Sequence, residues 1–175
     1  MLFRSFVAVG FAGSSVATWW SPDGDAWSRA TLEQPATDET TEILAVAAGT
    51  DGFLAVGSDH GREAAWVSSE GETWTRVGPD FPAGRFWDVT QSRDGGYVVV
   101  GTDHLPGDWN GAAWVVSPGQ DWHPAKATKS IAGPNADHLS RVWSFAGGYV
   151  AFGQERDPDN PDCLTCANSR DRRHT

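Results

Sequence analysis

Two aspartate-histidine pairs are the residues of this sequence whose types and spacing could do chemistry. Asp59-His60 and Asp103-His104 each follow, one residue later, a short apolar run that ends in glycine. A carboxylate beside an imidazole could ligate a metal ion or line a polar ligand pocket. The simpler interpretation is that each pair opens a turn, because a repeat duplicates residues without selection for a site. We therefore predict no metal site and retain these four residues as candidate ligand-binding positions.

Trp109 is a third candidate, in the segment PGDWNG. It falls outside the pattern that places the other tryptophans, so the argument for burial given below does not cover it. An exposed indole beside Asp108 and Asn110 could stack on a sugar ring. The alternative is that Trp109 folds down over its own sheet, as large aromatic side chains usually do.

The two cysteines, Cys163 and Cys166, form a CxxC motif near the end of the sequence. Such a motif can be a redox pair or half of a zinc site. The sequence has no second CxxC, and the nearby His174 would leave a tetrahedral zinc site one ligand short. We expect incidental thiols and no cofactor, and the role of the cysteines stays open.

A repeat provides the elements that must position these residues. A short apolar run ending in glycine occurs four times, at 6–10, 53–57, 97–101 and 149–153, and the starts lie 47, 44 and 52 residues apart. A second block, ATWWSPDGDAW at 17–27, returns as AAWVSSEGETW at 64–74 and AAWVVSPGQDW at 112–122. Two landmarks that share one period indicate a structural repeat.

Each repeat is predicted to form four short antiparallel strands, named A to D in chain order. Strand A is expected at 42–48, 85–91 and 140–146, and strand B is the apolar run. Units of this kind, about 40 to 50 residues long, are typical of β-propeller blades. Blades are apolar on both faces and bury them by stacking, so the tryptophans of strands C and D are expected to be mostly buried between or within blades: Trp19, Trp66 and Trp114, then Trp27, Trp74 and Trp122.

The predicted fold class is therefore all-β, an incomplete β-propeller of about three to three and a half blades in an open arc. Blades are expected near 5–30, 42–77, 85–125 and 140–153, within a propeller region 1–153, and an irregular tail at 154–175. The extra residues 104–111 are expected to form a surface loop. Closed propellers need about four to eight blades. We thus expect either a fragment of a larger propeller, truncated or frame-shifted, or self-association through open blade edges.

The turns between strands C and D resemble the Asp-box, or BNR, repeat, which combines a serine, an acidic residue, a glycine and a closing tryptophan. The segment at 21–27 matches best, Glu70 replaces the aspartate in the second copy, and Pro118 makes the third copy degenerate. The resemblance implies a sialidase-type or bacterial repetitive propeller in which the box is a structural turn. The residues concerned are Ser21, Asp23, Gly24, Trp27, Ser68, Glu70, Gly71, Trp74, Ser117, Gly119 and Trp122.

A sialidase-like glycoside hydrolase is the alternative function that this resemblance implies. It would require an arginine triad, a tyrosine nucleophile and acidic partners. Tyr97 and Tyr149 occupy the repeat position held elsewhere by phenylalanine, so we expect them to be packing residues. Arg85 and Arg141 share a position near the start of strand A but fit solvated strand ends equally well. No spacing identifies a carboxylate pair for glycosidase chemistry, so we predict a non-catalytic scaffold or binding module with no catalytic residue.

Composition limits the classes of partner. The 13 basic and 23 acidic residues give a net charge of −10, which disfavours nucleic acid and anionic membranes. No stretch approaches the length of apolar residues that spans a membrane. A carbohydrate or a protein is therefore the class of ligand that the composition leaves open. The first residues resemble a secretory signal, but the repeat indicates that they form a strand. The compartment stays open, and the family resemblance implies a secreted or cell-envelope parent.

Overall fold

The computed structural model describes residues 5–33, 40–105, 108–125 and 138–154, and this part of the chain contains strands and no helix. The first sheet, blade 1, contains β1 (Phe6–Ala12), β2 (Ser15–Ser21) and β3 (Ser28–Arg29). Blade 2 contains β5 (Glu42–Ala48), β6 (Phe53–Asp59), β7 (Arg62–Ser68) and β8 (Thr73–Val77), with β4 (Thr31–Leu32) added at its edge.

The third and fourth sheets follow the same plan. Blade 3 contains β9 (Gly84–Gln91), β10 (Tyr97–Leu105), β11 (Asp108–Ser117) and β12 (Asp121–Pro124). Blade 4 is the hairpin of β13 (His138–Phe145) and β14 (Gly148–Gln154). Neighbouring strands within each repeat pair antiparallel. The cysteines and residues 155–175 lie outside the described residues.

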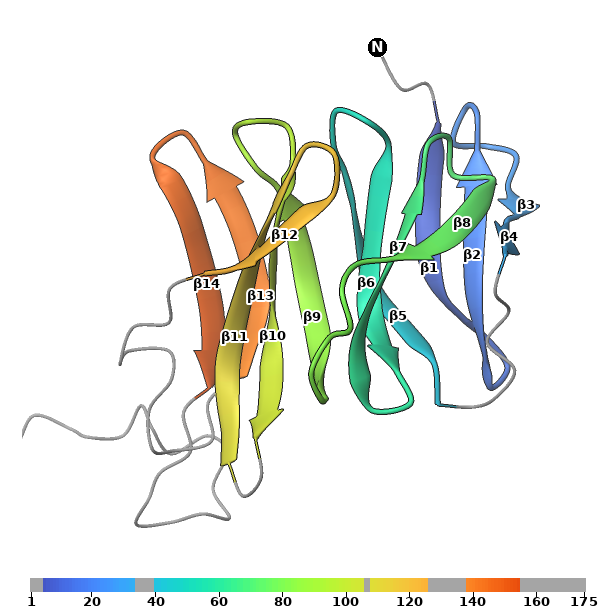
Figure 1. The fold of residues 1–175 in the computed structure, drawn as a ribbon. Helices are drawn as coiled ribbons and strands as arrows, with labels where there is room; N and C mark the ends of the chain where they lie inside the picture. The colour runs from blue at the N-terminus through green and yellow to red at the C-terminus, as the bar shows by residue number, and fades with distance from the viewer. Residues whose placement is uncertain (1–4, 34–39, 106–107, 126–137, 155–175) are drawn as a thin grey trace, which may run out of the picture.

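The four sheets stand side by side in chain order, from blue to orange in Figure 1. Strands β5, β9 and β13, which are the A strands of successive blades, lie next to one another. This arrangement is an all-β, incomplete propeller, so the predicted fold class is confirmed. None of the described residues belongs to a helix that could cross a membrane.

One connection differs from the predicted blade plan. Strand β4 follows blade 1 in the sequence but pairs parallel with β8 of blade 2. The Thr31 amide donates to the Glu72 carbonyl at 2.8 Å, and the Glu33 amide donates to the Trp74 carbonyl at 3.0 Å. The connection thereby satisfies backbone groups that an edge strand would otherwise leave open. The sequence repeat does not predict this pairing, because the two residues of β4 are too few to show an alternating pattern.

Each blade has two faces, because side chains alternate along a strand. We call the face that carries the first residue of strand B and the tryptophans of strands C and D the front, and the opposite face the back. The front of blade 2 packs on the back of blade 1, where Val7, Val9 and Trp20 lie. The front of blade 3 packs on the back of blade 2, where Leu54, Val56 and Ala65 lie. Every blade therefore covers the back of the one before it.

The predicted burial of the tryptophans holds in blade 2 and fails for Trp27 of blade 1. Trp66 and Trp74 are buried, at 3% and 0% exposure. Trp19, Trp114 and Trp122 are half-buried. Trp27 is 45% exposed, although it occupies the repeat position of Trp74. The physical reason is that Trp74 has blade 1 in front of it, whereas the front of blade 1 faces solvent.

Candidate functional site

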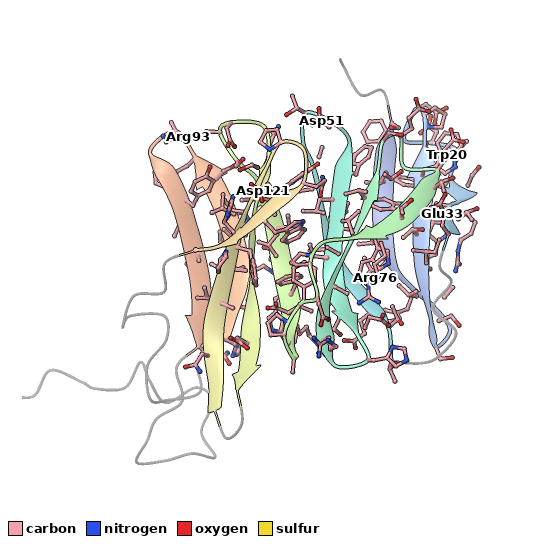
Figure 2. The ribbon with its side chains drawn as sticks, in the orientation of Figure 1. Trp20, Glu33, Asp51, Arg76, Arg93 and Asp121 are labelled. Carbon is pink, nitrogen blue, oxygen red and sulfur yellow. The ribbon has the colours of Figure 1, made fainter. Side chains whose placement is uncertain are left out.

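The connections of the blades separate into two ends. The B–C turns of blades 1 and 2, and the link from blade 2 to blade 3, lie at the lower end in Figure 1, which we call the loop end. The A–B and C–D turns lie at the upper end, which we call the turn end. Figure 2 shows Arg76 towards the loop end and Asp51 and Arg93 at the turn end. These B–C turns and the C–D turns therefore lie at opposite ends of the blades.

Asp59 sits at the loop end of blade 2, where β6 finishes. Its Oδ1 atom accepts a hydrogen bond from the Thr41 hydroxyl at 2.7 Å and lies 2.8 Å from Nδ1 of His60. Its Oδ2 atom accepts a hydrogen bond from Arg76. Burial opposes the charge of Asp59, but Thr41, His60 and Arg76 outweigh it, so the pKa of this carboxyl is below its ordinary value. Asp59 is thus an ionised group that connects Thr41, the residue before β5, to Arg76 on β8.

The second aspartate-histidine pair is placed differently. Asp103 is half-buried inside β10, opposite Asn110 on β11 and Gly84 on β9. The strand pairing continues through His104–Trp109 and Leu105–Asp108. The expected surface loop is therefore wrong for these residues: equal additions to both strands lengthen the hairpin instead. The side chains of His104 and Trp109 lie outside the described part of the chain, so their candidate roles stay predictions.

The described residues contain no group of three or more histidine, cysteine or acidic side chains placed to hold an ion. A different carboxyl lies between the two blades. Glu63, on the back of blade 2, is fully buried, and neither of its carboxyl oxygens has a hydrogen-bond partner of normal geometry among the described residues. A Cβ atom built on Gly84 of blade 3 would lie 3.3 Å from the Glu63 Cγ atom.

Burial is the main cause that raises the pKa of Glu63 to about 8, and the negative charge of Asp103 raises it further. The nearby Trp114 indole offsets only part of this shift. Glu63 is not among the candidate residues that the sequence predicted. A signal was available, because the same repeat position holds Val16 in blade 1 and Gly111 in blade 3.

A cluster at the loop end gathers residues from three blades. The Arg85 guanidinium lies 5.0 Å from the centre of the Trp87 ring and 2.7 Å from the Glu42 carboxylate of blade 2. The Trp87 indole donates to the Thr102 hydroxyl at 2.9 Å. The His138 ring of blade 4 lies 6.1 Å from that of Trp87. We call these five residues the Arg85–Trp87 cluster. An aromatic ring among charged and hydroxyl groups can bind a polar ligand that has an apolar face.

The segment at 21–27, which resembles an Asp-box, forms a hydrogen-bonded turn in blade 1. The Asp23 carboxylate accepts from the Asp25 and Ala26 amides at 2.8 and 3.0 Å and from the Ser21 hydroxyl at 3.0 Å. The Ala26 and Asp25 amides and Ser21 lower the pKa of Asp23, in that order. Gly24 has φ of +88°, and its carbonyl accepts from the Trp27 indole at 3.0 Å. The potentially reactive carboxylate is thus engaged by its own turn.

The other two C–D turns lose parts of this network. In blade 2 the Ser68 hydroxyl accepts from the Gly71 amide at 2.8 Å and the Trp74 indole donates to the Gly71 carbonyl at 3.0 Å. In blade 3 the block at 112–122 has the same length, but Val116 occupies the position of Ser21 and Ser68. The buried indole nitrogen of Trp122 has no hydrogen-bond partner in the described residues. The C–D turn of blade 3 therefore has neither the serine at that position nor, in the described residues, the indole contact of the other two turns.

The tyrosine hydroxyls bind the backbone of neighbouring blades. The Tyr97 hydroxyl donates to the Gly52 carbonyl of blade 2 at 3.0 Å, and the Tyr149 hydroxyl accepts from the Arg93 amide of blade 3 at 3.0 Å. Burial raises the pKa of Tyr97 to about 12, and the charge of Asp51 contributes. Tyr97 therefore remains a neutral hydroxyl under ordinary conditions.

The fold defines the class of this chain as an incomplete, propeller-like all-β protein. No protein-family model and no curated protein matches it, so the BNR resemblance remains a prediction. Among solved structures, the chain is similar to a "putative glycoside hydrolase" from Parabacteroides distasonis, at 11% sequence identity and a TM-score of 0.48. The match covers 85% of this chain and 60% of that one. A TM-score this low supports no inference about the function of this chain.

Proposed function

We propose that this chain is a non-catalytic propeller scaffold that binds a carbohydrate at the loop end, through the Arg85–Trp87 cluster. The observation that supports the proposal is that side chains of three successive blades form the cluster. Glu42, Trp87 and His138 come from three successive blades and meet beside one aromatic ring. An indole flanked by hydrogen-bonding side chains suits a sugar, whose ring has one apolar face and polar edges.

The charges favour a neutral sugar over an anionic one. Arg85 already pairs with Glu42 at 2.7 Å, so the recognising group we expect is Trp87. The net charge of −10 would also repel an acidic glycan. The groups that could serve catalysis have structural partners: Asp23 in its turn, and Tyr97 across a blade boundary. These contacts favour binding over turnover.

A glycan array tests the proposal. The wild-type chain should bind neutral glycans, and Trp87→Ala should weaken that binding about 10-fold, the free energy of one ring contact. Trp27→Ala is the matched control, because Trp27 is a tryptophan at the turn end and is 45% exposed. It should leave binding unchanged. Equal binding by the Trp87 variant and the wild type would refute the site. Hydrolysis of a sialoside by the wild-type chain would favour the glycoside hydrolase alternative.

A further inference from the structure

The two end faces of the arc expose large apolar side chains. On the front of blade 1, Phe6 is 54% exposed and Trp27 is 45% exposed. On the back of blade 4, Trp143, Phe145, Val150 and Phe152 are between 40% and 57% exposed. Trp143 and Phe152 pack against each other there, with ring centroids 5.0 Å apart. Contiguous exposed apolar groups of this kind mark interaction surfaces.

The repeat identifies what such faces contact. Phe6 occupies the position of Phe53 and Tyr97, which are 5% and 4% exposed because a preceding blade covers them. Val150 and Phe152 occupy the positions of Leu54 and Val56, which are fully buried under the front of the following blade. The exposed residues are therefore positions that the internal blades bury against another blade.

The two end faces complement each other. Each internal contact joins the front of one blade to the back of the preceding one, as the two core clusters show. The front of blade 1 thus fits the back of a blade, and the back of blade 4 fits the front of one. The two faces lie at opposite sides of the arc in Figure 1, so one copy does not bring them together.

We propose that two copies of this chain associate head to tail, the front of blade 1 of one copy on the back of blade 4 of the other. This contact repeats the internal packing. It does not require a tyrosine hydroxyl bond between blades, because blade 2 packs on blade 1 with Phe53 at the repeat position of Tyr97. A heterologous contact closes into a ring or grows as a filament. Two copies supply eight sheets, which lies within the range of closed propellers, about four to eight blades.

Light scattering coupled to size-exclusion chromatography tests the proposal on the full chain. The wild type should have the mass of two copies. Phe6→Asp blocks the front and Val150→Asp blocks the back, and each places a charge in the contact. Each variant should raise the dissociation constant at least about 20-fold. Val115→Asp is the matched control: Val115 is 37% exposed but lies on blade 3, away from both end faces. It should keep the wild-type mass.

Mixing the two blocked variants decides the polarity of the contact. One intact front and one intact back remain in the mixture, so it should form a one-to-one pair that grows no further. If fronts paired with fronts, Val150→Asp alone would still associate, and the proposal would be wrong. A monomeric wild type at high concentration would overturn it as well. Circular dichroism of each variant separates loss of association from loss of folding.

Discussion

Changing Glu63 to glutamine should stabilise the protein, by an amount that grows with pH. The folded state raises the pKa of Glu63 from 4.5 to about 8, so the folded chain binds this proton more tightly than the unfolded chain. Stability therefore falls as pH rises from about 4.5 to about 8, by up to 1.36 kcal/mol per pH unit. Over the whole interval, the loss attributable to Glu63 reaches about 5 kcal/mol.

Glutamine has nearly the same shape as glutamate and no charge, so the variant does not have this pH-dependent loss of stability. At pH 4.5 the variant and the wild type should have similar free energies of unfolding, and towards pH 8 the variant should become several kcal/mol more stable. Urea unfolding followed by tryptophan fluorescence measures both proteins across this range. The protein concentration is held fixed, because association would add to the apparent stability.

Two further variants test the cause of the shift. Asp103→Asn removes the charge that raises the pKa of Glu63, so the pH dependence of stability should decrease. Glu70→Gln changes an exposed carboxyl and should leave the dependence intact. If the stability of Glu63→Gln and of the wild type fell in parallel with pH, the argument for a buried, tightly protonated Glu63 would be refuted.

Three other substitutions, two of them compared with a control variant, test the packing and the turns. Trp74→Ala should cost about 3 to 5 kcal/mol in a urea melt, because this side chain is fully buried, and Trp27→Ala should cost clearly less. Tyr97→Phe should cost about 1 kcal/mol, since it removes the hydroxyl that binds the Gly52 carbonyl; an unchanged unfolding midpoint would contradict this contact. Ser68→Ala should cost about 1 kcal/mol through the lost Gly71 amide contact, whereas Ser69→Ala, an exposed neighbour, should be neutral in the same urea melt.

Much of the fold follows from local sequence, because strands and turns are local structures. The apolar runs at 53–57 and 97–101 become β6 and β10, and the period places them in successive blades. The glycines at the C–D turns occupy positive φ, at +88° for Gly24 and +93° for Gly71, which glycine adopts without strain. Such features depend on a few neighbouring residues, so a single sequence contains enough information to predict them.

The environment of individual side chains was decided by tertiary structure. Trp27 and Trp74 occupy the same repeat position, and one is exposed and the other buried because only the second has a blade in front of it. The Arg85–Trp87 cluster joins residues 42, 87 and 138, whose separation in sequence gives no sign that they meet. The charge state of Glu63 depends on the blade that covers it. Periodicity specifies which face a residue occupies, whereas burial, charge and site geometry depend on what packs against that face.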